Sequence, residues 1–490
     1  MAVLESIFAH ARSAPDKAAL IANGQPLSYG AFAASIVLAR RHLQAQAIDR
    51  ERVAVLFTAN LAQAWIVGLA LRSLGVTNVS GRSSADIEGL GLDAVSVVST
   101  ASAAWPELTT TAADAGAPRI VLPPDDYAAA PAIGEEPALA ADKAGGQILL
   151  TSGTTGLYKK VLIDPAHEAA SVMLRADLYG LGPGSVVNMF DFGGWTVAGY
   201  QTPISVWSQG GAVVLYQGPE CWRALATPGI TLTYAQPLMV AELLAAPEDA
   251  PLRNDAMTLI VGAGVLPLAH WRAARERLTR DIHTGYGSTE AGPCALTRIE
   301  TPEDLAWHRI HPAFLVQVVD DAHRPLPAGR SGAVRVRTSG IDGYLGDEAA
   351  TRAFFRDGFF YPGDLGVLRE DGRLSVLGRI TDVINVRGDK LPTTPIETQL
   401  QEALGAKAVC VFSAPDKDGA ESVHVAIERG RKITADQLRA ALLAALPQLP
   451  SAYVHAVDGF ARNPMGKIDR AALRARLLAG RDGPGGDSGV

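Results

Sequence analysis

The stretch TSGTTGLYKK, residues 151–160, places hydroxyl side chains and glycines in a short loop that ends in two lysines. It directly follows the short apolar run 147–150, which is typical of a buried strand. Successive backbone N–H groups of a glycine-rich turn form a concave anion site, to which hydroxyls and a lysine add further donors. The stretch therefore predicts a polyphosphate-binding loop after a strand, although a solvent-exposed turn would use the same residue types.

Two common nucleotide motifs do not describe this loop. A P-loop would need a glycine five places after Gly153, where Tyr158 stands. A G-x-G-x-x-G motif is also not found after any predicted strand. The loop by itself therefore predicts phosphate binding and leaves the kind of nucleotide enzyme open.

Composition and charge exclude several classes of protein. The chain has 490 residues, too many for a single core, and is 48% hydrophobic and 19% charged, as a globular protein is. A formal net charge of −7 without a long basic run argues against nucleic acid as the main partner. Three distant cysteines, Cys221, Cys294 and Cys410, predict neither a disulfide framework nor a zinc cluster, and a reducing cytoplasm fits them. Residues 1–17 predict an amphipathic helix rather than a signal peptide, and no long apolar run predicts a membrane span.

Strand-like and helix-like segments alternate over most of the chain, which favours an α/β fold. The predicted strands include 52–57, 211–216, 230–234 and 258–261, and the predicted helices include 61–74, 237–246 and 268–278. Segment 101–146 is predicted to form loops and short pieces at an edge. Near residue 330 the pattern changes to period-two strands such as 332–337, and a smaller unit begins after Arg379. Within it, Thr434 and Gln437 have the spacing of a capping box, and 480–490 predicts a disordered tail.

Four further stretches contain residue types that a nucleotide enzyme needs. In GYGSTE (285–290) a tyrosine between glycines could stack on a base, with a hydroxyl and a carboxylate for phosphate and Mg²⁺. In YPGDLG (361–366) a carboxylate on a turn could bind a ribose diol. Stretch 378–391 has hinge-like residues before a short strand, and 463–470 has a lysine in a turn before the last helix. Each also has an ordinary explanation: a turn that begins a helix, a plain turn, a charged hairpin and a solvated lysine.

In this order and at these intervals, the five stretches resemble the adenylate-forming superfamily, which holds acyl-CoA synthetases, adenylation domains of peptide synthetases and luciferases. The resemblance covers nearly the whole chain and includes 27–29, 261–264, 343–344 and Thr351. It implies a large N-terminal domain, residues 1–380, of layered α/β sheets with a small β-barrel-like subdomain. It further implies a hinge and a small mobile α+β C-terminal domain, residues 381–479, which carries a catalytic lysine.

The resemblance also implies nucleotide-binding roles for individual residues. These residues are Thr151, Ser152, Gly153, Thr154, Thr155, Gly156, Lys159, Gly262, Ala263, Gly264, Tyr286, Gly287, Asp364 and Arg379. The loop residues and Lys159 would close on the β- and γ-phosphates of ATP, while 262–264 would lie beside the adenine with Tyr286 stacked on it. Asp364 would bind the ribose hydroxyls with the help of Arg379.

The reaction implied by the resemblance has two steps. A substrate carboxylate attacks the α-phosphorus of ATP, pyrophosphate leaves and an acyl-adenylate forms; Thr289, Glu290 as the Mg²⁺ ligand and Lys467 would catalyse this step. Positive charge is the main need where two anions meet, which lysine and Mg²⁺ supply. The small domain would then rotate, Gly388 would line a thiol channel, and the thiol of coenzyme A or of a phosphopantetheine arm would displace AMP.

The acid substrate is expected to bind at Asp191, Trp195 and Gly285. The stretch DFGGW (191–195) resembles the Asp-x-Gly-Trp segment of acetyl- and medium-chain acyl-CoA synthetases, with one residue inserted. Alternatively, Asp191 holds the ammonium group of an amino acid, as in amino-acid adenylating domains, or it caps a helix. Coenzyme A is the expected thiol, and the alternative is a stand-alone enzyme that loads an amino or aryl acid onto a separate carrier protein.

Three positions depart from the family pattern. Most relatives have proline where Tyr158 stands, glycine where Lys160 stands, and an aspartate or lysine hinge where Thr381 stands. We hypothesise that Tyr158 stiffens or shields the loop by packing, in place of the fixed φ of proline. Neutral drift at this position is the alternative.

Other enzyme classes lack support in the sequence. A serine hydrolase would need a G-x-S-x-G elbow, which is not found. His308 and His311 form the nearest histidine pair, and no further ligand has the spacing of a metal site. A catalytically inactive ATP-binding module is the remaining alternative, if Lys467 does not reach the site.

Overall fold

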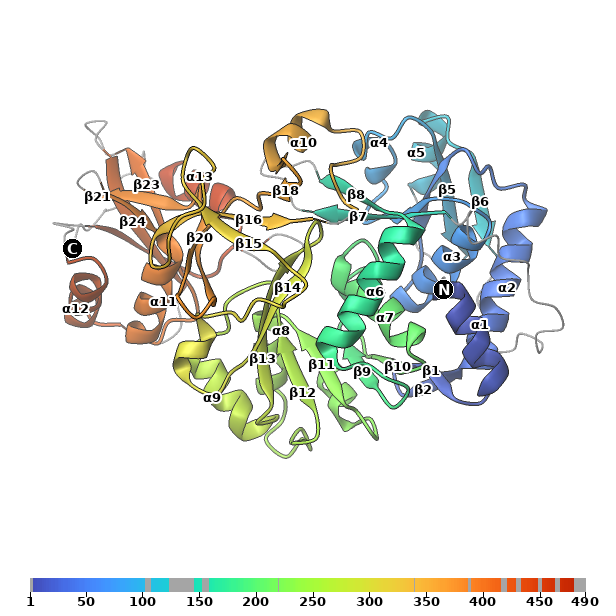
Figure 1. Cartoon of the computed structure of the whole chain (residues 1–490), viewed down its shortest axis with the longest axis horizontal. Helices are drawn as coiled ribbons and strands as arrows, with labels where there is room; N and C mark the ends of the chain where they lie inside the picture. The colour runs from blue at the N-terminus through green and yellow to red at the C-terminus, as the bar shows by residue number, and fades with distance from the viewer. Residues whose placement is uncertain are drawn as a thin grey trace. The chain divides into compact units, whose positions relative to one another are not determined.

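The computed structural model of the chain describes residues 3–101, 107–122, 145–151, 158–218, 220–338, 340–386, 389–415, 421–428, 433–447, 452–462 and 468–479. Five loop residues (152–156), Gly388, Lys467 and the predicted tail 480–490 lie outside the described residues. The chain divides into two units, whose elements are labelled in Figure 1. Unit 1 comprises residues 1–263, 274–296 and 337–360, and unit 2 comprises residues 264–273, 297–336 and 361–490.

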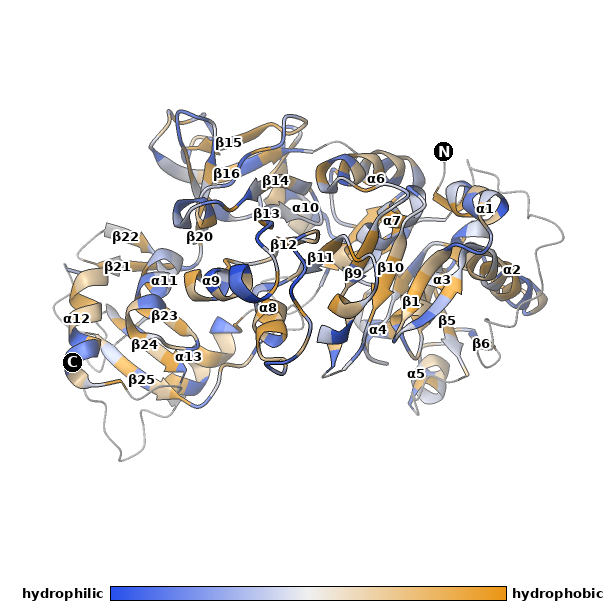
Figure 2. Ribbon diagram, turned by 90° about the horizontal axis from the view of Figure 1, so that it is seen from below, coloured by the Kyte–Doolittle hydropathy of each residue, from blue (hydrophilic) through white to orange (hydrophobic). Residues whose placement is uncertain are grey.

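Unit 1 contains an eight-stranded sheet with the order β14-β13-β12-β11-β9-β10-β1-β2. Its strands are β1 (Ala18–Ala22), β2 (Gln25–Ser28), β9 (Val186–Met189), β10 (Ala212–Leu215), β11 (Leu232–Ala235), β12 (Thr258–Val261), β13 (Ile282–Ser288) and β14 (Gly292–Arg298). The six strands from β13 to β1 pair in parallel, so their carboxyl ends lie at one edge, where open α/β sheets bind their ligands. Strands β9 and β10 are nearly continuous apolar runs, coloured orange in Figure 2, as buried parallel strands are.

A six-stranded sheet in the same unit has the order β6-β5-β3-β4-β7-β8. Its strands are β3 (Val53–Phe57), β4 (Asn78–Ser80), β5 (Val95–Thr100), β6 (Arg119–Leu122), β7 (Gln147–Thr151) and β8 (Lys159–Ile163). Strands β7 and β8 are antiparallel, and Thr151 lies opposite Lys159. The prediction of a strand before the glycine-rich loop is therefore confirmed, and β6 occupies the edge predicted for segment 101–146.

The helices of unit 1 are α1 (Val3–Ser13), α2 (Tyr29–Ala45), α3 (Leu61–Ser73), α4 (Asp86–Gly89), α5 (Leu108–Asp114), α6 (Pro165–Tyr179), α7 (Val197–Ser208), α8 (Pro237–Leu244) and α10 (Glu348–Phe354), and α9 (Leu268–Arg277) crosses the unit boundary. A 3₁₀ helix (Cys221–Ala226) and a hairpin of β17 (Phe355–Arg356) and β18 (Phe359–Phe360) complete the unit. Asp164 caps α6 by accepting from two backbone N–H groups, and Gly180 ends it in the left-handed conformation. Helices α6 and α7 lie side by side (Figure 1).

Unit 2 contains antiparallel strands and a second core. Strands β15 (Val316–Val319), β16 (Ser331–Arg337), β19 (Asp364–Leu368) and β20 (Leu374–Arg379) pair in antiparallel order, and β21 (Val383–Val386) forms a hairpin with β22 (Asp389–Pro392). Strands β23 (Val409–Pro415), β24 (Glu421–Glu428) and β25 (Tyr453–Val457) form a three-stranded sheet. Its helices are α11 (Thr393–Leu404), α12 (Ala435–Ala445) and α13 (Arg470–Ala479), with a 3₁₀ helix at Pro302–Leu305. Residues 384–452 contribute a separate apolar core, and Val411, Val425 and Leu400 lie at its centre.

The structure confirms most of the predicted organisation. The α/β fold class is correct, α1 buries one apolar face, and Thr434 and Gln437 form the capping box of α12. One local interpretation is wrong: Ser288 to Glu290 do not begin a helix, because β13 continues through Ser288 and the chain then turns into β14. The domain boundary at residue 380 stays a prediction. Among the described residues, the structure contains no helix that is long and apolar enough to cross a membrane.

Candidate active site

The carboxyl edge of the eight-stranded sheet holds the predicted substrate residue Asp191. This residue follows β9, and its Oδ2 accepts a hydrogen bond of 2.8 Å from Nε2 of Gln217, which follows the neighbouring strand β10. Both side chains are exposed. The helix-cap interpretation of Asp191 is wrong, because Thr196 caps α7 by accepting from the backbone N–H of Gly199. Asp191 is therefore available at the edge where a ligand of this sheet would bind.

The turn after β12 carries the predicted adenine-binding residues Gly262 and Ala263. Ala263 has a left-handed backbone with φ of 63°, a conformation that costs energy for a residue with a Cβ and that marks a tight turn. A side chain at Gly262 would collide with the Tyr234 hydroxyl, so glycine lets this ring lie against the strip. Gly264, the next residue of the strip, belongs to unit 2.

The hairpin of β13 and β14 carries the predicted base-stacking tyrosine. Gly285, Tyr286 and Gly287 lie on β13, and Tyr286 is partly buried. A Cβ at Gly287 would meet the carbonyl oxygen of Gly292 on β14, so the two backbones approach too closely for any side chain. Thr289 lies in the turn between the strands. The next residue, Glu290, lies in the same turn, two residues before β14 begins.

Glu290 is a buried carboxylate with a specific partner. Its side chain is 6% exposed, and its Oε1 accepts a hydrogen bond of 2.7 Å from the hydroxyl of Tyr344. The backbone of Tyr344 is fixed in turn, because its N–H donates to Oγ1 of Thr351 at 2.9 Å. A Cβ at Gly343 would collide with the Thr351 methyl group. The stretch 343–351 therefore holds the predicted metal ligand in place.

Lys159 lies near the same tyrosine that binds Glu290. Its ammonium nitrogen is 3.3 Å from the ring centroid of Phe354 and 5.2 Å from that of Tyr344. Ammonium groups are attracted to the faces of aromatic rings. The structure thus brings together the loop lysine, the buried carboxylate and Tyr344, from three separate parts of the sequence.

Two of the three departures from the family pattern, Tyr158 and Lys160, contact one short segment of unit 1. The Tyr158 ring packs against the guanidinium of Arg82, which lies 3.5 Å from the ring centroid and is held by Asp86 at the start of α4. Lys160 is buried and donates a 2.7 Å hydrogen bond to the carbonyl of Leu90, at the end of α4. Burial lowers the pKa of Lys160. The packing that we hypothesised for Tyr158 is present, and its effect on the loop stays a prediction.

Trp195, the second predicted pocket residue, lies on the segment that joins β9 to α7. Its ring packs against the core of the six-stranded sheet, as the Tyr158 ring does. Its carbonyl accepts a 2.8 Å hydrogen bond from the N–H of Leu150, just before the phosphate loop. Gly193 has a φ of 74° and no space for a side chain beside the Trp195 ring. The predicted substrate segment is therefore anchored to the strand that leads into the loop.

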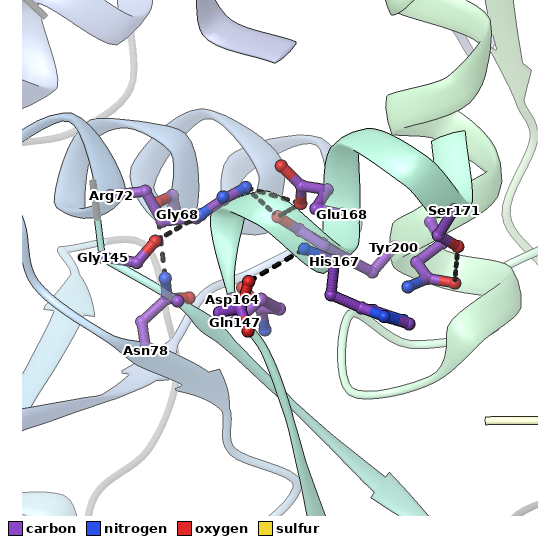
Figure 3. Close-up of polar contacts among 12 residues, drawn as sticks. Gly68, Arg72, Asn78, Gly145, Gln147, Asp164, His167, Glu168, Ser171 and Tyr200 are labelled. Carbon is purple, nitrogen blue, oxygen red and sulfur yellow. Dashed lines mark hydrogen bonds and ion pairs between the residues drawn. The ribbon is translucent and has the colours of Figure 1, made fainter. Parts of the chain in front are cut away.

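A buried ionic network that was not predicted from the sequence joins the elements around the loop (Figure 3). Arg72 of α3 donates to the Gly145 carbonyl at 2.8 Å, to Oε1 of Glu168 on α6 at 2.7 Å and to the hydroxyl of Tyr200 on α7. Tyr200 also donates to Glu168 at 2.7 Å. Burial alone would lower the pKa of Arg72, but the Glu168 carboxylate and Tyr200 outweigh it and raise that pKa. The one sequence signal was a single arginine within the mostly apolar helix 61–73.

The described residues fit a Mg²⁺ ion that is held mainly by phosphate oxygens. Among the residues that the structure describes, no group of three or more His, Cys, Asp or Glu side chains could enclose a metal. Mg²⁺ does not need such a group, because it usually takes one or two carboxylates, waters and substrate phosphates. A buried carboxylate with one oxygen bonded to Tyr344 matches this pattern.

Unit 2 holds the predicted ribose-binding pair. Asp364 begins β19 and Arg379 ends β20, and they lie opposite each other in the antiparallel pair. Nη1 of Arg379 is 3.2 Å from Oδ1 of the buried Asp364. The same nitrogen also donates to the Pro362 carbonyl. Gly363 has a φ of 78°, which glycine adopts without strain. The carboxylate is thus fixed on a turn, as the sequence predicted.

An ion pair joins the residue after the predicted hinge to the last helix. Thr381 contacts Oδ1 of Asp382 at 3.2 Å, and Asp382 forms an ion pair of 3.1 Å with Arg470. Arg470, the first residue of α13, also pairs with Glu397 of α11 at 2.6 Å. Burial alone would lower the pKa of Arg470, but the bonds to Glu397 raise it. The helix that follows the lysine stretch is therefore anchored to the hinge and to α11.

Comparison with known proteins agrees with these features. The family described as AMP-binding enzyme matches residues 7–345. Triostin synthetase I from Streptomyces triostinicus is 30% identical over 352 residues, which are 68% of this chain and 65% of that protein. A salicylyl-CoA synthase / salicylate adenylyltransferase from Streptomyces sp is 31% identical over 350 residues, 66% of this chain and 62% of that protein. The matched region thus spans slightly less than two thirds of these relatives' own length.

The fold has a close counterpart among solved structures. The amide bond synthetase McbA from Marinactinospora thermotolerans superposes with a TM-score of 0.79 at 23% identity, covering 97% of this chain and 99% of that chain. At this identity the likeness concerns the fold. Together with the match over residues 7–345, it shows that the chain belongs to the family of AMP-binding enzymes, within the adenylate-forming superfamily that its five motifs resemble.

Proposed function

We propose that the protein activates a carboxylic acid with ATP, releases pyrophosphate and transfers the acyl group from the adenylate to the thiol of coenzyme A. The observation that carries the proposal is the convergence of Lys159 and Glu290 on Tyr344 at the end of the glycine-rich loop. A cation and a carboxylate at one place suit a nucleotide phosphate with its Mg²⁺.

The loop and the residues of the described site have separate tasks in this proposal. Lys159 and the backbone of the loop bind the β- and γ-phosphates, and Glu290, oriented by Tyr344, holds Mg²⁺. When bound, this ion neutralises the phosphate charge that builds up as pyrophosphate leaves. Asp364, fixed by Arg379, accepts hydrogen bonds from the ribose hydroxyls.

The remaining tasks fall to residues outside the described part of the chain. We assign Lys467 to the contact with the substrate carboxylate and the α-phosphate, and Gly388 to the thiol channel, both by resemblance. We further propose that residues 381–479 form the mobile domain that carries them, as the sequence predicts.

ATP–pyrophosphate exchange tests the first half of the reaction. Added acid should drive exchange, and Glu290→Gln should lower the rate by about 10²-fold or more, since the loss of one charge-stabilising group has such an effect. Glu242→Gln, on α8, is the matched control and should retain activity. Bound ATP without exchange for any acid in a broad panel would instead support the inactive binding module.

The acceptor needs a separate assay, because the names of the relatives point to different acceptors. One relative is named a CoA synthase as well as an adenylyltransferase, and the fold counterpart is named an amide bond synthetase. Release of AMP from the preformed adenylate should accelerate with coenzyme A. Acceleration by a carrier protein or a simple amine, but not by coenzyme A, would overturn the thiol assignment and leave the adenylation step intact.

A further inference from the structure

Arg175 on α6 is a buried cation with neutral partners. Its side chain is 2% exposed, like that of Arg72. Its Nη2 donates to Oε1 of Gln201 on α7 at 2.8 Å, and its Nη1 donates to the hydroxyl of Tyr179 at 3.4 Å. Within the described residues, its Nε has no hydrogen-bond partner and no carboxylate lies within ion-pair distance of the guanidinium. Arg72, by contrast, is paired with Glu168 at 2.7 Å.

This arrangement lacks an acceptor. A buried charge is costly unless it is paired, and a buried N–H without a partner adds to the cost. Gln201 accepts the hydrogen bond from Arg175 with its side-chain oxygen. Its side-chain nitrogen, Nε2, is also buried and has no partner among the described residues. Two adjacent side chains thus offer donors to an acceptor that the described protein does not supply.

Aromatic contacts connect this cluster to the candidate active site. Tyr179 contacts Tyr234 with ring centroids 6.2 Å apart, and Tyr234 contacts Phe192, which follows Asp191, at 5.7 Å. The Tyr234 hydroxyl lies against Gly262 of the predicted adenine strip. Burial raises the pKa of Tyr234 and the charge of Arg175 opposes this rise, which reflects their proximity.

These contacts link the buried Arg175 to the predicted acid-binding edge through Tyr179 and Tyr234. An acid bound at the carboxyl edge of β9 and β11 would have to extend past Phe192 and Tyr234 to reach Arg175. Its reacting carboxylate must remain at the edge, where the nucleotide binds. A second anionic group at the far end of the acid would supply the acceptor that Arg175 and Gln201 lack.

We propose that Arg175, assisted by Gln201, binds a second carboxylate of the substrate, so that the enzyme activates a dicarboxylic acid. This inference rests on the proposed adenylation. A guanidinium forms two parallel hydrogen bonds with a carboxylate, which gives both affinity and orientation. The described partners of Arg175 are neutral, so the charge of its guanidinium is not compensated by them.

The test compares straight-chain dicarboxylic acids of about three to eight carbons with monocarboxylic acids of equal length, so that the distance between the two carboxylates is varied. In wild-type ATP–pyrophosphate exchange, kcat/KM should favour one diacid over its monoacid by about 30-fold or more, the usual consequence of a buried charge pair. Arg175→Met should remove this preference while exchange with the monoacid continues. Arg175→Lys should retain part of it.

A second readout separates a ligand-binding arginine from a structural one. Arg175→Met should keep or raise the unfolding midpoint without ligand, because it removes an unpaired buried charge, and the preferred diacid should raise the midpoint of wild type only. Arg40→Met is the matched control: Arg40 lies on α2 and its Nη1 also has no partner among the described residues. This variant should keep the diacid preference.

The outcomes distinguish the two proposals. Exchange with monoacids as good as with every diacid, or a diacid preference that survives in Arg175→Met, would overturn the role of Arg175 and leave adenylation standing. No exchange with any acid would instead overturn the proposed function itself.

Discussion

At the scale of single residues, Tyr344 is central to the candidate site. It donates a hydrogen bond to Glu290, and Lys159 lies over its ring. Without the hydroxyl, a buried carboxylate would lose its described partner, which costs about 1–3 kcal/mol. We therefore expect Tyr344→Phe to lower the free energy of unfolding by about this amount in urea titrations. Tyr453→Phe on β25 is the control, and equal stability of both variants would contradict the importance of this bond.

His308 gives the protein a pH-dependent stability. Burial lowers the pKa of this imidazole from 6.5 to about 4 in the folded state. Between these pH values His308 is protonated in the unfolded chain but neutral in the folded protein. The stability that the neutral His308 contributes is therefore fully present above pH 6.5 and is lost as the pH falls toward 4. His308→Gln should reduce the slope of unfolding free energy against pH in this window, by up to about 1.4 kcal/mol per pH unit. Identical slopes in both proteins would contradict it.

At the scale of elements, the short helix α4 supports the strand that leaves the phosphate loop. Tyr158 reaches it through Arg82 and Asp86, and Lys160 reaches it through the Leu90 carbonyl. The sequence predicted β7 and the loop, because an apolar run and glycines are local signals. It could not predict α4 as a neighbour, since 70 residues separate Lys160 from Leu90.

Truncation of Tyr158 should loosen the loop. We expect Tyr158→Ala to raise the KM for ATP by about three- to tenfold, since a stacked guanidinium–ring contact is worth about 0.5–1 kcal/mol or more. Tyr158→Phe retains the ring and should behave like wild type. Steady-state kinetics at varied ATP concentration measure the difference, and an unchanged KM and kcat in Tyr158→Ala would favour neutral drift.

At the scale of the whole molecule, unit 1 depends on the network of Arg72, Glu168 and Tyr200. This network joins α3, α6, α7 and the residues just before β7. Glu168→Gln would leave Arg72 buried and uncompensated, so unfolding free energy should fall by about 3–5 kcal/mol. The double variant Arg72→Met with Glu168→Leu should regain most of the loss. Denaturant titration of wild type and the two variants checks this, and a double variant no more stable than Glu168→Gln would argue against a shared network.

The overall α/β fold and the five motifs were predictable, because strand periodicity, glycine turns and caps such as Thr434 are local features. The partners that fix the site could not be predicted. Tyr344 is 54 residues from Glu290, and Arg72 is 96 residues from Glu168, so only the folded chain joins them. The sequence also left open whether Asp191 binds an acyl substrate, binds an ammonium group or caps a helix. The structure excludes the helix cap, because Thr196 caps α7.

The central claim is that the acid attacks the α-phosphorus of ATP, and oxygen-18 tests it most directly. With an acid labelled in both carboxylate oxygens, ATP, Mg²⁺ and coenzyme A, one labelled oxygen should appear in AMP, because the carboxylate oxygen that bonds to phosphorus leaves with it. Mass spectrometry of the isolated nucleotide measures the transfer. Unlabelled AMP, or label in inorganic phosphate with ADP as the product, would contradict the account.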